Sequence, residues 1–143
     1  MTKVFLEAKE TAVRTFLDHI RGDKKFFHPH ELTYEALLGI CEAVGRDYYG
    51  FLVYEDRILA YGMLRGWDEG YEVPSLGIAV AEKGRGAGRR MMNELHKTAV
   101  EMGAKRIRLT VMKENKVAVS LYKSMGYELT DKDDRNYLGT KKL

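Results

Sequence analysis

The chain has one cysteine, two prolines and no long apolar run. Cys41 has no partner for an intrachain disulfide, and no set of cysteines and histidines has the spacing of a zinc site. No apolar run reaches about 18 residues, so no transmembrane helix is predicted. The first ten residues lack the apolar core of a signal peptide. These absences predict a cytoplasmic protein that needs no metal and does not enter a membrane.

Linkers, internal repeats and low-complexity segments are also missing. The chain has 143 residues, of which 45% are hydrophobic and 31% charged, and this balance is typical of a folded protein. A chain of this length fits one domain with one buried core. The sequence therefore predicts a single domain over residues 1–143.

The net charge is only +3, which ordinary solubility explains. Nucleic-acid binding calls for a denser stripe of basic residues interleaved with aromatic ones. The one tight basic cluster is Lys83, Arg85, Arg89 and Arg90, and it lies within a glycine-rich segment. This context favours a small phosphorylated molecule as the ligand and predicts no nucleic-acid partner.

Hydrophobic periodicity predicts a mixed α/β fold. Helices are predicted over 8–21, 33–44, 86–102 and 115–125, and strands over 4–6, 49–54, 58–64, 73–80, 106–112, 127–130 and 136–141. Strand 106–112 alternates, with Ile107, Leu109 and Val111 on one side. Hairpins alternate with crossover helices, so a mixed sheet with helices on both faces is expected.

The segment 80–88 joins an apolar strand to a helix and contains Gly84, Gly86 and Gly88. Small residues at the start of a helix leave backbone N–H groups uncovered, and these form an anion site with the positive end of the helix dipole. The spacing matches neither a dinucleotide-binding motif nor a P-loop. Taken alone, the segment fits a pyrophosphate site or a flexible turn with solvated cations.

Two motifs in order carry a family resemblance. Segment 83–88 reads Lys-Gly-Arg-Gly-Ala-Gly and resembles the acyl-CoA motif of the GNAT superfamily of N-acetyltransferases, with the apolar strand 76–80 leading into it. Segment 115–127 reads Asn-x-x-Ala-x-x-Leu-Tyr-x-x-x-Gly-Tyr and resembles the second signature of that family. Lys83 departs from the glutamine or arginine that usually opens the first motif, and the loop before it is short.

The resemblance implies a fold and a co-substrate. The GNAT fold has a twisted, mostly antiparallel sheet of about seven strands, four flanking helices and a splayed pair of parallel strands. Acetyl-CoA is then the expected co-substrate, with its pyrophosphate on the glycine turn and its pantetheine arm beside strand 76–80. The implied CoA-binding residues are Ile78, Ala79, Val80, Lys83, Gly84, Arg85, Gly86, Ala87, Gly88, Arg89, Asn115, Ala118 and Tyr122.

The resemblance also implies a mechanism of direct acetyl transfer to an amine. A backbone N–H near Ile78 or Ala79 polarises the acetyl carbonyl, and Tyr122 gives a proton to the departing CoA sulfur. An alkylammonium has a pKa near about 10.4, so a base is needed. Glu72 is the first candidate for this base. Asp68, Glu69 and Tyr71 remain alternatives, as does a solvated turn carboxylate without a role.

The acceptor is expected opposite CoA, where aromatic and polar residues suggest a ring-bearing amine such as an amino sugar, free or nucleotide-linked. The predicted acceptor residues are Phe26, Phe27, His28, His30, Met63, Arg65 and Trp67. The structural alternative is that Phe26 and Phe27 belong to the hydrophobic core and the histidines are solvated. Three functional alternatives also remain open: a non-catalytic acyl-CoA-binding domain, a protein or peptide amine as acceptor, and a longer acyl donor. The protein is expected to be a monomer or a homodimer.

Overall fold

The computed structural model describes residues 2–4, 7–20, 26–27, 29–43, 45–81 and 85–143. Its helices are α1 (Glu10–His19), α2 (Tyr34–Glu42), the short 3₁₀ helix η3 (Trp67–Glu69), α3 (Ala87–Glu101) and α4 (Lys116–Ser124). Its strands are β1 (Thr2–Val4), β2 (Tyr48–Tyr54), β3 (Arg57–Arg65), β4 (Ser75–Val80), β5 (Arg106–Met112), β6 (Glu128–Asp131) and β7 (Asn136–Lys142).

All strands form one seven-stranded sheet with the order β1-β2-β3-β4-β5-β7-β6. Five neighbouring pairs are antiparallel, and only β4 and β5 run parallel. The helix α3 connects these two strands, as a parallel pair requires. The prediction of a mixed, mostly antiparallel sheet with flanking helices is confirmed.

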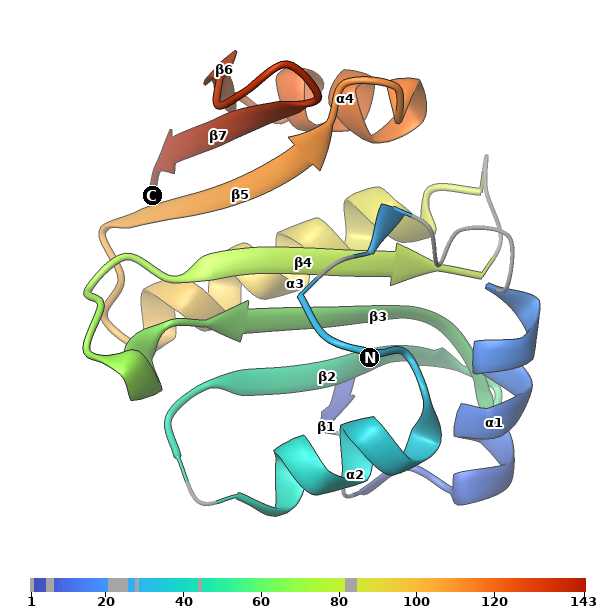
Figure 1. Ribbon diagram of the computed structural model, residues 1–143. Coiled ribbons are helices and arrows are strands. Elements are labelled where there is room, and N and C mark those ends of the chain that lie inside the picture. The colour runs from blue at the N-terminus through green and yellow to red at the C-terminus, as the bar shows by residue number, and fades with distance from the viewer. Residues whose placement is uncertain (1, 5–6, 21–25, 28, 44, 82–84) are drawn as a thin grey trace.

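Strands β4 and β5 separate almost as soon as they meet. Their only registered pair is Ser75 with Arg108, next to which the Arg108 N–H donates to the Pro74 carbonyl at 3.0 Å. Figure 1 shows β5 diverging from β4 toward the β7 edge of the sheet. The splayed parallel pair implied by the resemblance is therefore present, and it leaves an opening in the middle of the sheet.

The core has two parts, one on each face of the sheet. Phe51, Tyr61 and Met63 pack with the apolar residues of α1 and α2, whereas Leu64 and Leu76 pack with those of α3 and α4. The alternation of strand side chains produces this division. In Figure 1, α3 lies behind the sheet and α2 in front of it.

Several element boundaries differ from the prediction, among them those of the first strand and the first helix, and two of the differences have a local reason. The strand expected over 73–80 begins at Ser75, because Pro74 has no N–H to donate to a neighbouring strand. Thr33 caps α2 as expected, its Oγ1 accepting from the Ala36 N–H at 3.1 Å. However, α2 ends at Glu42 and the backbone of Ala43 is extended, so Gly45 is not its closing residue.

Gly62, in the middle of β3, allows α3 to lie close against the sheet. A Cβ at this position would be 2.8 Å from both Leu95 Cδ1 and Met91 Cε, and those side chains are fully buried. We expect Gly62→Val to lower the free energy of unfolding by about 1–3 kcal/mol through overpacking, measured by urea denaturation. Gly39→Ala is the control, because a Cβ there meets nothing within 4 Å in the middle of α2. An equal loss in both variants would contradict this account.

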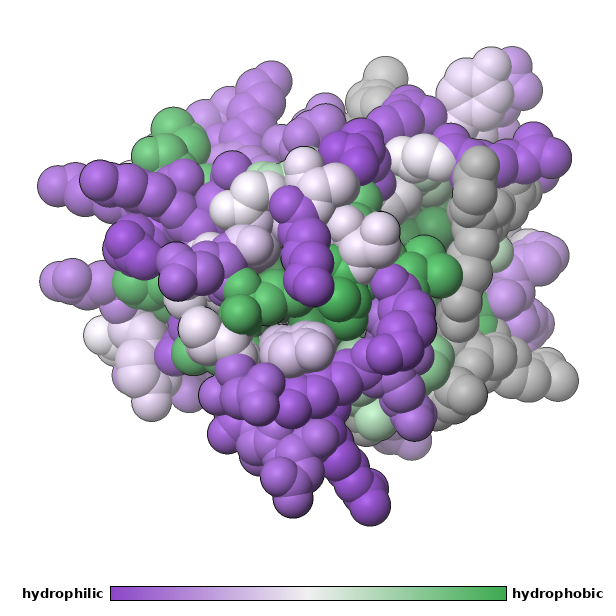
Figure 2. Space-filling view, turned by 90° about the horizontal axis from the view of Figure 1, so that it is seen from above, coloured by the Kyte–Doolittle hydropathy of each residue, from purple (hydrophilic) through white to green (hydrophobic). Residues whose placement is uncertain are grey.

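The surface is mainly polar. Figure 2 shows one face, on which apolar side chains gather in the middle and hydrophilic ones surround them. Large apolar side chains that stand exposed include Tyr54, Tyr71, Val100 and Val117. Over the described residues, no helix has the length and apolar character needed to cross a membrane.

Candidate functional site

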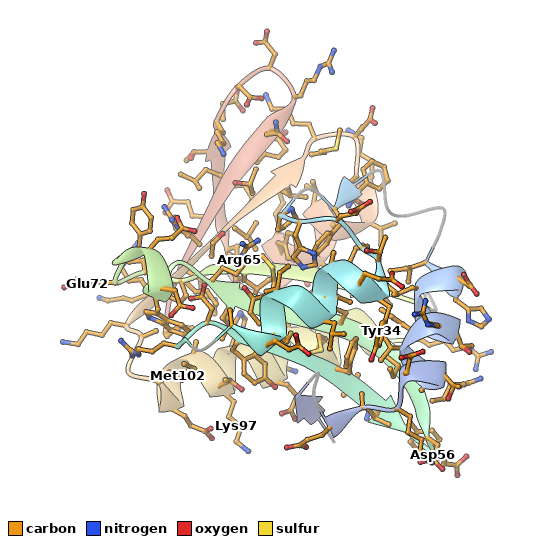
Figure 3. All side chains as sticks on the ribbon, turned by 60° about the horizontal axis from the view of Figure 1, so that its bottom comes forward. Tyr34, Asp56, Arg65, Glu72, Lys97 and Met102 are labelled. Atoms are coloured by element: carbon orange, nitrogen blue, oxygen red, sulfur yellow. The ribbon has the colours of Figure 1, made fainter. Side chains whose placement is uncertain are left out.

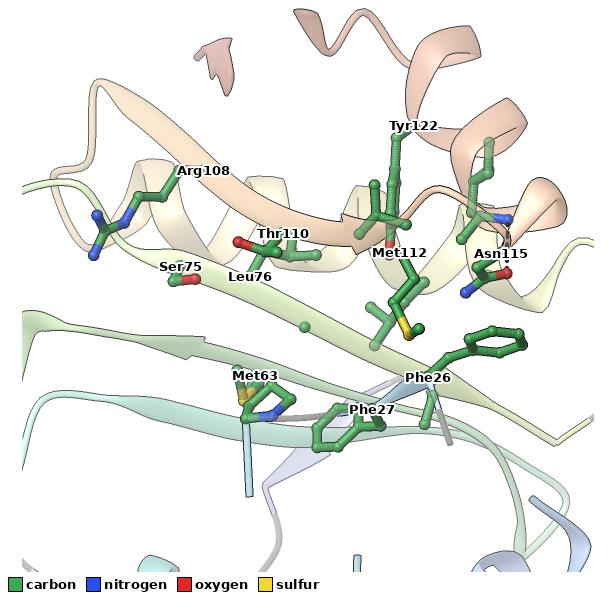
Figure 4. A pocket seen from close by; sticks show the side chains of 18 of the residues that line it. Phe26, Phe27, Met63, Ser75, Leu76, Arg108, Thr110, Met112, Asn115 and Tyr122 are labelled. Carbon is green, nitrogen blue, oxygen red and sulfur yellow. Dashed lines mark hydrogen bonds between the residues drawn. The ribbon is translucent and has the colours of Figure 1, made fainter. Parts of the chain in front are cut away.

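A cavity of about 670 Å³ occupies the opening between β4 and β5. Its walls come from β3, β4, the first turn of α3, β5 and α4, and also from Phe26, Phe27, Pro29 and the turn before β4. Figure 4 shows Tyr122 reaching into it from α4, with Arg108 at one end, Asn115 toward the other and Phe27 below β4. Segments far apart in the sequence therefore meet in one chamber.

The edge of β4 that faces β5 carries backbone groups without a strand partner beyond Ser75. On its other side, β4 pairs with β3 along its whole length, from Ser75 with Arg65 to Val80 with Ala60. The residues Ile78, Ala79 and Val80 all line the cavity. Unpaired strand edges bind extended ligands by main-chain hydrogen bonds. This edge therefore offers N–H and C=O groups to a ligand in the opening.

The glycine turn lies at one end of the cavity. Gly86 precedes α3 with φ +77°, a left-handed conformation that glycine adopts without strain. Gly86, Ala87, Gly88 and Arg89 line the cavity, so the uncovered N–H groups of the first turn of α3 lie beside it. Arg89 Nη2 donates to Ser124 Oγ at 2.6 Å, which holds the guanidinium between α3 and α4.

The other residues predicted to bind CoA in this turn either do not line the cavity or lie outside the described residues. Arg85 is exposed and is not among the lining residues. Lys83 and Gly84 lie outside the described residues.

Asn115 caps α4 and faces the cavity as well. Its Oδ1 accepts from the Ala118 N–H at 3.4 Å, as the dashed line in Figure 4 marks. Asn115 and Ala118 both line the cavity. The capping role is therefore visible in the structure, and the side-chain amide remains close enough to the chamber to contact a ligand there.

Tyr122 stands at the centre of the site. Its side chain is 6% exposed and packs against the ring of Tyr127, with 5.8 Å between the ring centres. Its hydroxyl points into the opening between β4 and β5 (Figure 4). Burial raises the pKa of this phenol well above its usual value. Tyr122 is therefore a neutral O–H donor at physiological pH.

Next to Tyr122 lies a partly buried polar pair, His96 and Tyr127. His96 Nε2 lies 2.6 Å from the Tyr127 hydroxyl, and the two rings are 5.6 Å apart. Burial, together with a smaller effect of the nearby Lys141, lowers the pKa of His96 to about 4. Burial also raises the pKa of Tyr127. At neutral pH the pair is therefore uncharged, and the hydrogen bond joins a neutral phenol to a neutral imidazole.

The low pKa of His96 makes stability depend on pH. The unfolded chain takes up a proton on this histidine near its usual pKa of 6.5, whereas the folded chain does so only near 4. The free energy of unfolding should therefore fall as the pH drops from about 6.5 toward 4. We expect His96→Gln to make this fall shallower, measured by urea denaturation at pH 7 and pH 5. His19→Gln, at an exposed histidine, is the control, and equal slopes in all three proteins would refute the assignment.

The carboxylates lie differently from the prediction. Glu72 is exposed and is not among the residues that line the cavity. Figure 3 shows it at the margin of the molecule, while Arg65 lies further in. The turn bends after η3, so Glu69 and Tyr71 line the cavity instead. Asp68 points away, because its carboxylate accepts from the backbone N–H groups of Arg46 and Asp47.

Four of the seven predicted acceptor residues line the cavity. They are Phe26, Phe27, Met63 and Arg65. His28 lies outside the described residues. The other two are placed elsewhere in the fold.

His30 and Trp67 are structural. The His30 ring lies 2.7 Å from the Glu31 carbonyl through Nδ1 and 2.8 Å from the Tyr61 hydroxyl through Nε2. Burial lowers the pKa of His30, so the neutral ring donates from Nδ1 and accepts at Nε2. Trp67 is 9% exposed and belongs to the core. Neither side chain is among the residues that line the cavity, and each is used in packing.

Sequence reasoning missed Arg108, Thr110 and Lys132, which line the cavity. The alternation of β5 indicates that Arg108 and Thr110 lie opposite Ile107 and Leu109. It does not show that this opposite face borders an opening in the sheet. Lys132 follows β6 and its Nζ lies 3.4 Å from Thr110 Oγ1, a contact that depends on the packing of distant segments.

Among the described residues, no group of three or more His, Cys, Asp or Glu side chains could hold a metal ion. The site therefore consists of backbone groups, a neutral phenol and charged side chains at its ends.

Comparison with known proteins agrees with this geometry. Residues 13–127 match the model of the acetyltransferase (GNAT) family. An uncharacterized N-acetyltransferase, YdgE of Bacillus subtilis, is 30% identical over 76% of this chain and 73% of its own length. An uncharacterized Mycobacterium leprae protein is 41% identical over 41% of this chain, and the match spans only 15% of that protein.

Solved structures share the fold. A GCN5-related N-acetyltransferase from Kribbella flavida superimposes with a TM-score of 0.78 at 20% identity, covering 100% of this chain and 97% of that one. The PaiA N-acetyltransferase of Thermoplasma acidophilum, solved with coenzyme A, gives a TM-score of 0.61 at 18% identity over 68% of this chain and 61% of that one. With the family match spanning most of the sequence, the chain belongs to the acetyltransferase (GNAT) family, as its two motifs predict.

Proposed function

We propose that this chain, as one domain over residues 1–143, moves an acetyl group from acetyl-CoA to a primary amine while both are bound. The observation that carries the proposal is the opening between β4 and β5, in which the unpaired β4 edge faces the Tyr122 hydroxyl. A thioester lying along that edge would have its sulfur beside a proton donor. The coenzyme A complex of the Thermoplasma acidophilum protein supports this choice of co-substrate.

The coenzyme is expected to enter at the glycine turn. N–H groups of Gly86 to Arg89 and the positive end of the α3 dipole attract its pyrophosphate. The pantetheine arm then follows Ile78 to Val80 and passes Asn115 and Ala118. A Cβ at Gly88 would be 3.2 Å from Leu121 Cδ2, so larger side chains at this turn crowd the contact with α4.

The reaction balances with groups of this chain. The amine nitrogen forms a bond to the acetyl carbon, and the carbonyl oxygen gains charge that a β4 N–H near Ile78 or Ala79 stabilises. The C–S bond then breaks, and the thiolate takes a proton from Tyr122. The burial that raises the pKa of Tyr122 also disfavours a bare thiolate beside it. The ammonium gives one proton to a base, and through it to solvent, before it attacks. The nitrogen loses a second proton after attack, and that proton restores the phenol through solvent.

We assign the base role to Glu69 in place of Glu72. Glu69 lines the cavity and Glu72 does not. A carboxylate at the cavity wall attracts the ammonium and accepts its proton through water that fills the cavity between them. Glu69→Gln should therefore lower kcat more than Glu72→Gln does.

The walls on the acceptor side are apolar and aromatic. Phe26, Phe27 and Met63 line this part, and Phe27 packs on Tyr61 with ring centres 5.9 Å apart. Aromatic faces suit the ring of an amino sugar, which supports that acceptor class. A peptide amine is the second candidate, because the cavity opens to solvent.

The experiment is a release assay for the CoA thiol, with calorimetry of acetyl-CoA binding beside it. The amines are amino sugars, polyamines, amino acids and peptide N-termini. Thiol release that depends on one of the amines is the expected result. Binding without release for any amine indicates the non-catalytic domain, and failure to bind acetyl-CoA removes the proposal altogether.

A further inference from the structure

Two arginines lie in one row across the sheet at the end of the cavity away from the glycine turn. Arg65 of β3 pairs with Ser75 of β4, and Ser75 pairs with Arg108 of β5. Residues paired in register project to the same face of a sheet, and all three line the cavity. The row marks the point where β4 and β5 separate.

This end of the cavity carries two arginines, Arg65 and Arg108. A third cation, Lys132, lines the cavity further along β5, where its Nζ lies 3.4 Å from Thr110 Oγ1. Among the described residues, no carboxylate comes within 4.0 Å of either arginine. Glu69 lines the same cavity without forming such a pair. The positive charge is therefore not neutralised within the described part of the chain.

Arg108 also carries an unsatisfied donor. Its Nε is buried and has no hydrogen-bond partner among the described residues, while its guanidinium lies 4.9 Å from the centre of the Tyr71 ring. Arg65 is held in place by a hydrogen bond of 2.8 Å from Nη1 to the Pro29 carbonyl. Buried donors are almost always paired, and an arginine fork matches the two oxygens of a carboxylate or phosphate. An incoming oxyanion would satisfy the Arg108 donor.

We infer that the acceptor amine carries an oxyanion, either a carboxylate or a phosphate monoester, that binds between Arg108 and Arg65 at Ser75. This inference rests on the proposed function, because it names the substrate class of the same cavity. The anion fixes the far end of the acceptor, and its amine extends toward Tyr122.

The length of the cavity also determines the distance between the acid group and the amine of the acceptor. Arg108 and Met112 both line it and lie four residues apart on β5, about 13 Å at the usual rise of a strand. In Figure 4, Arg108 lies at one end of the chamber, and the Tyr122 side chain enters further along it, beside Met112. An α-amino acid carries both groups on one carbon, which is too close. The acceptor therefore has several bonds between its amine and its acid.

Matched amines test the inference. The first pair is 6-aminohexanoate and its neutral amide, 6-aminohexanamide, and the second is 5-aminopentyl phosphate and 5-aminopentanol. We expect kcat/KM for at least one acid to exceed that of its neutral partner by about tenfold or more. Calorimetry of the same amines with CoA present repeats the comparison without turnover. The pair that shows the preference identifies the anion as carboxylate or phosphate.

Substitutions in β5 test whether Arg108 causes the preference for acids over neutral amines. Arg108→Gln should reduce the acid-to-neutral ratio by about tenfold, and Arg108→Lys should restore part of it. Arg106→Gln is the control, because Arg106 lies two residues earlier on β5, is exposed and does not line the cavity. Thermal unfolding of each variant checks that it is folded.

The outcomes separate this inference from the proposed function. Acetylation of acids and neutral amines at equal rates refutes the anion site and leaves acetyl transfer standing. A preference that survives Arg108→Gln refutes the assignment to this row. Absence of both transfer and acid-dependent binding refutes the function and the inference together.

Discussion

Tyr122→Phe is expected to lower kcat by about a hundredfold or more, the usual contribution of a positioned general acid. The substitution removes only the hydroxyl, so the ring still packs against Tyr127 and the fold is retained. Acetyl-CoA affinity should stay within about twofold, because the lost group acts on the thiolate that forms during the reaction. Steady-state thiol release and calorimetry of acetyl-CoA measure the two effects.

Tyr127→Phe is the matched control for this prediction. Tyr127 is also a buried phenol of the same cluster, but its hydroxyl pairs with His96 and it does not line the cavity. Loss of that hydroxyl should change stability more than kcat. An unchanged rate in Tyr122→Phe, or equal losses in both variants, would show that Tyr122 is not the proton donor.

Gly86→Glu is expected to weaken coenzyme binding by about a hundredfold or more. It places a carboxylate where the pyrophosphate is proposed to lie, and like charges at short range repel strongly. It also forces a residue with a Cβ into a left-handed backbone at φ +77°. Calorimetry with coenzyme A, which needs no acceptor, measures the loss directly.

Gly103→Glu separates the charge effect from the backbone strain. Gly103 follows α3 at φ +90°, and a Cβ there meets nothing within 4 Å, as at Gly86. Both variants should therefore lose similar stability, while only Gly86→Glu loses coenzyme affinity. Coenzyme affinity that persists in Gly86→Glu would exclude the first turn of α3 as the phosphate site.

Local patterns account for most of the elements. Thr33 and Asn115 each cap a helix where their side chains predict it, since an N-cap needs only a short oxygen-bearing side chain at the boundary. The alternation of strand 106–112 is reproduced, with Ile107 and Leu109 buried and Arg106 exposed. The glycine turn and Tyr122 were predictable because one contiguous segment carries each motif.

The acceptor side was less predictable, since its residues come from separate segments. Glu72 and Glu69 are three residues apart in one turn, and only the path of the chain after η3 decides which reaches the cavity. His30 and Trp67 resemble ligand-binding residues in the sequence, yet each is used in packing. Periodicity reports which face of an element is apolar, but not which elements cover the other face.

By itself, the sequence determined the mixed α/β class, the family and the position of the glycine turn, because these depend on periodicity, capping and spacing within short segments. Only the tertiary structure decided that β4 and β5 part after a single registered pair, and that Arg65 and Arg108 then flank Ser75 in one row. Strand register is set by packing across the whole sheet. A charged side chain on an alternating strand can therefore line a cavity, although the sequence alone suggests that it faces solvent.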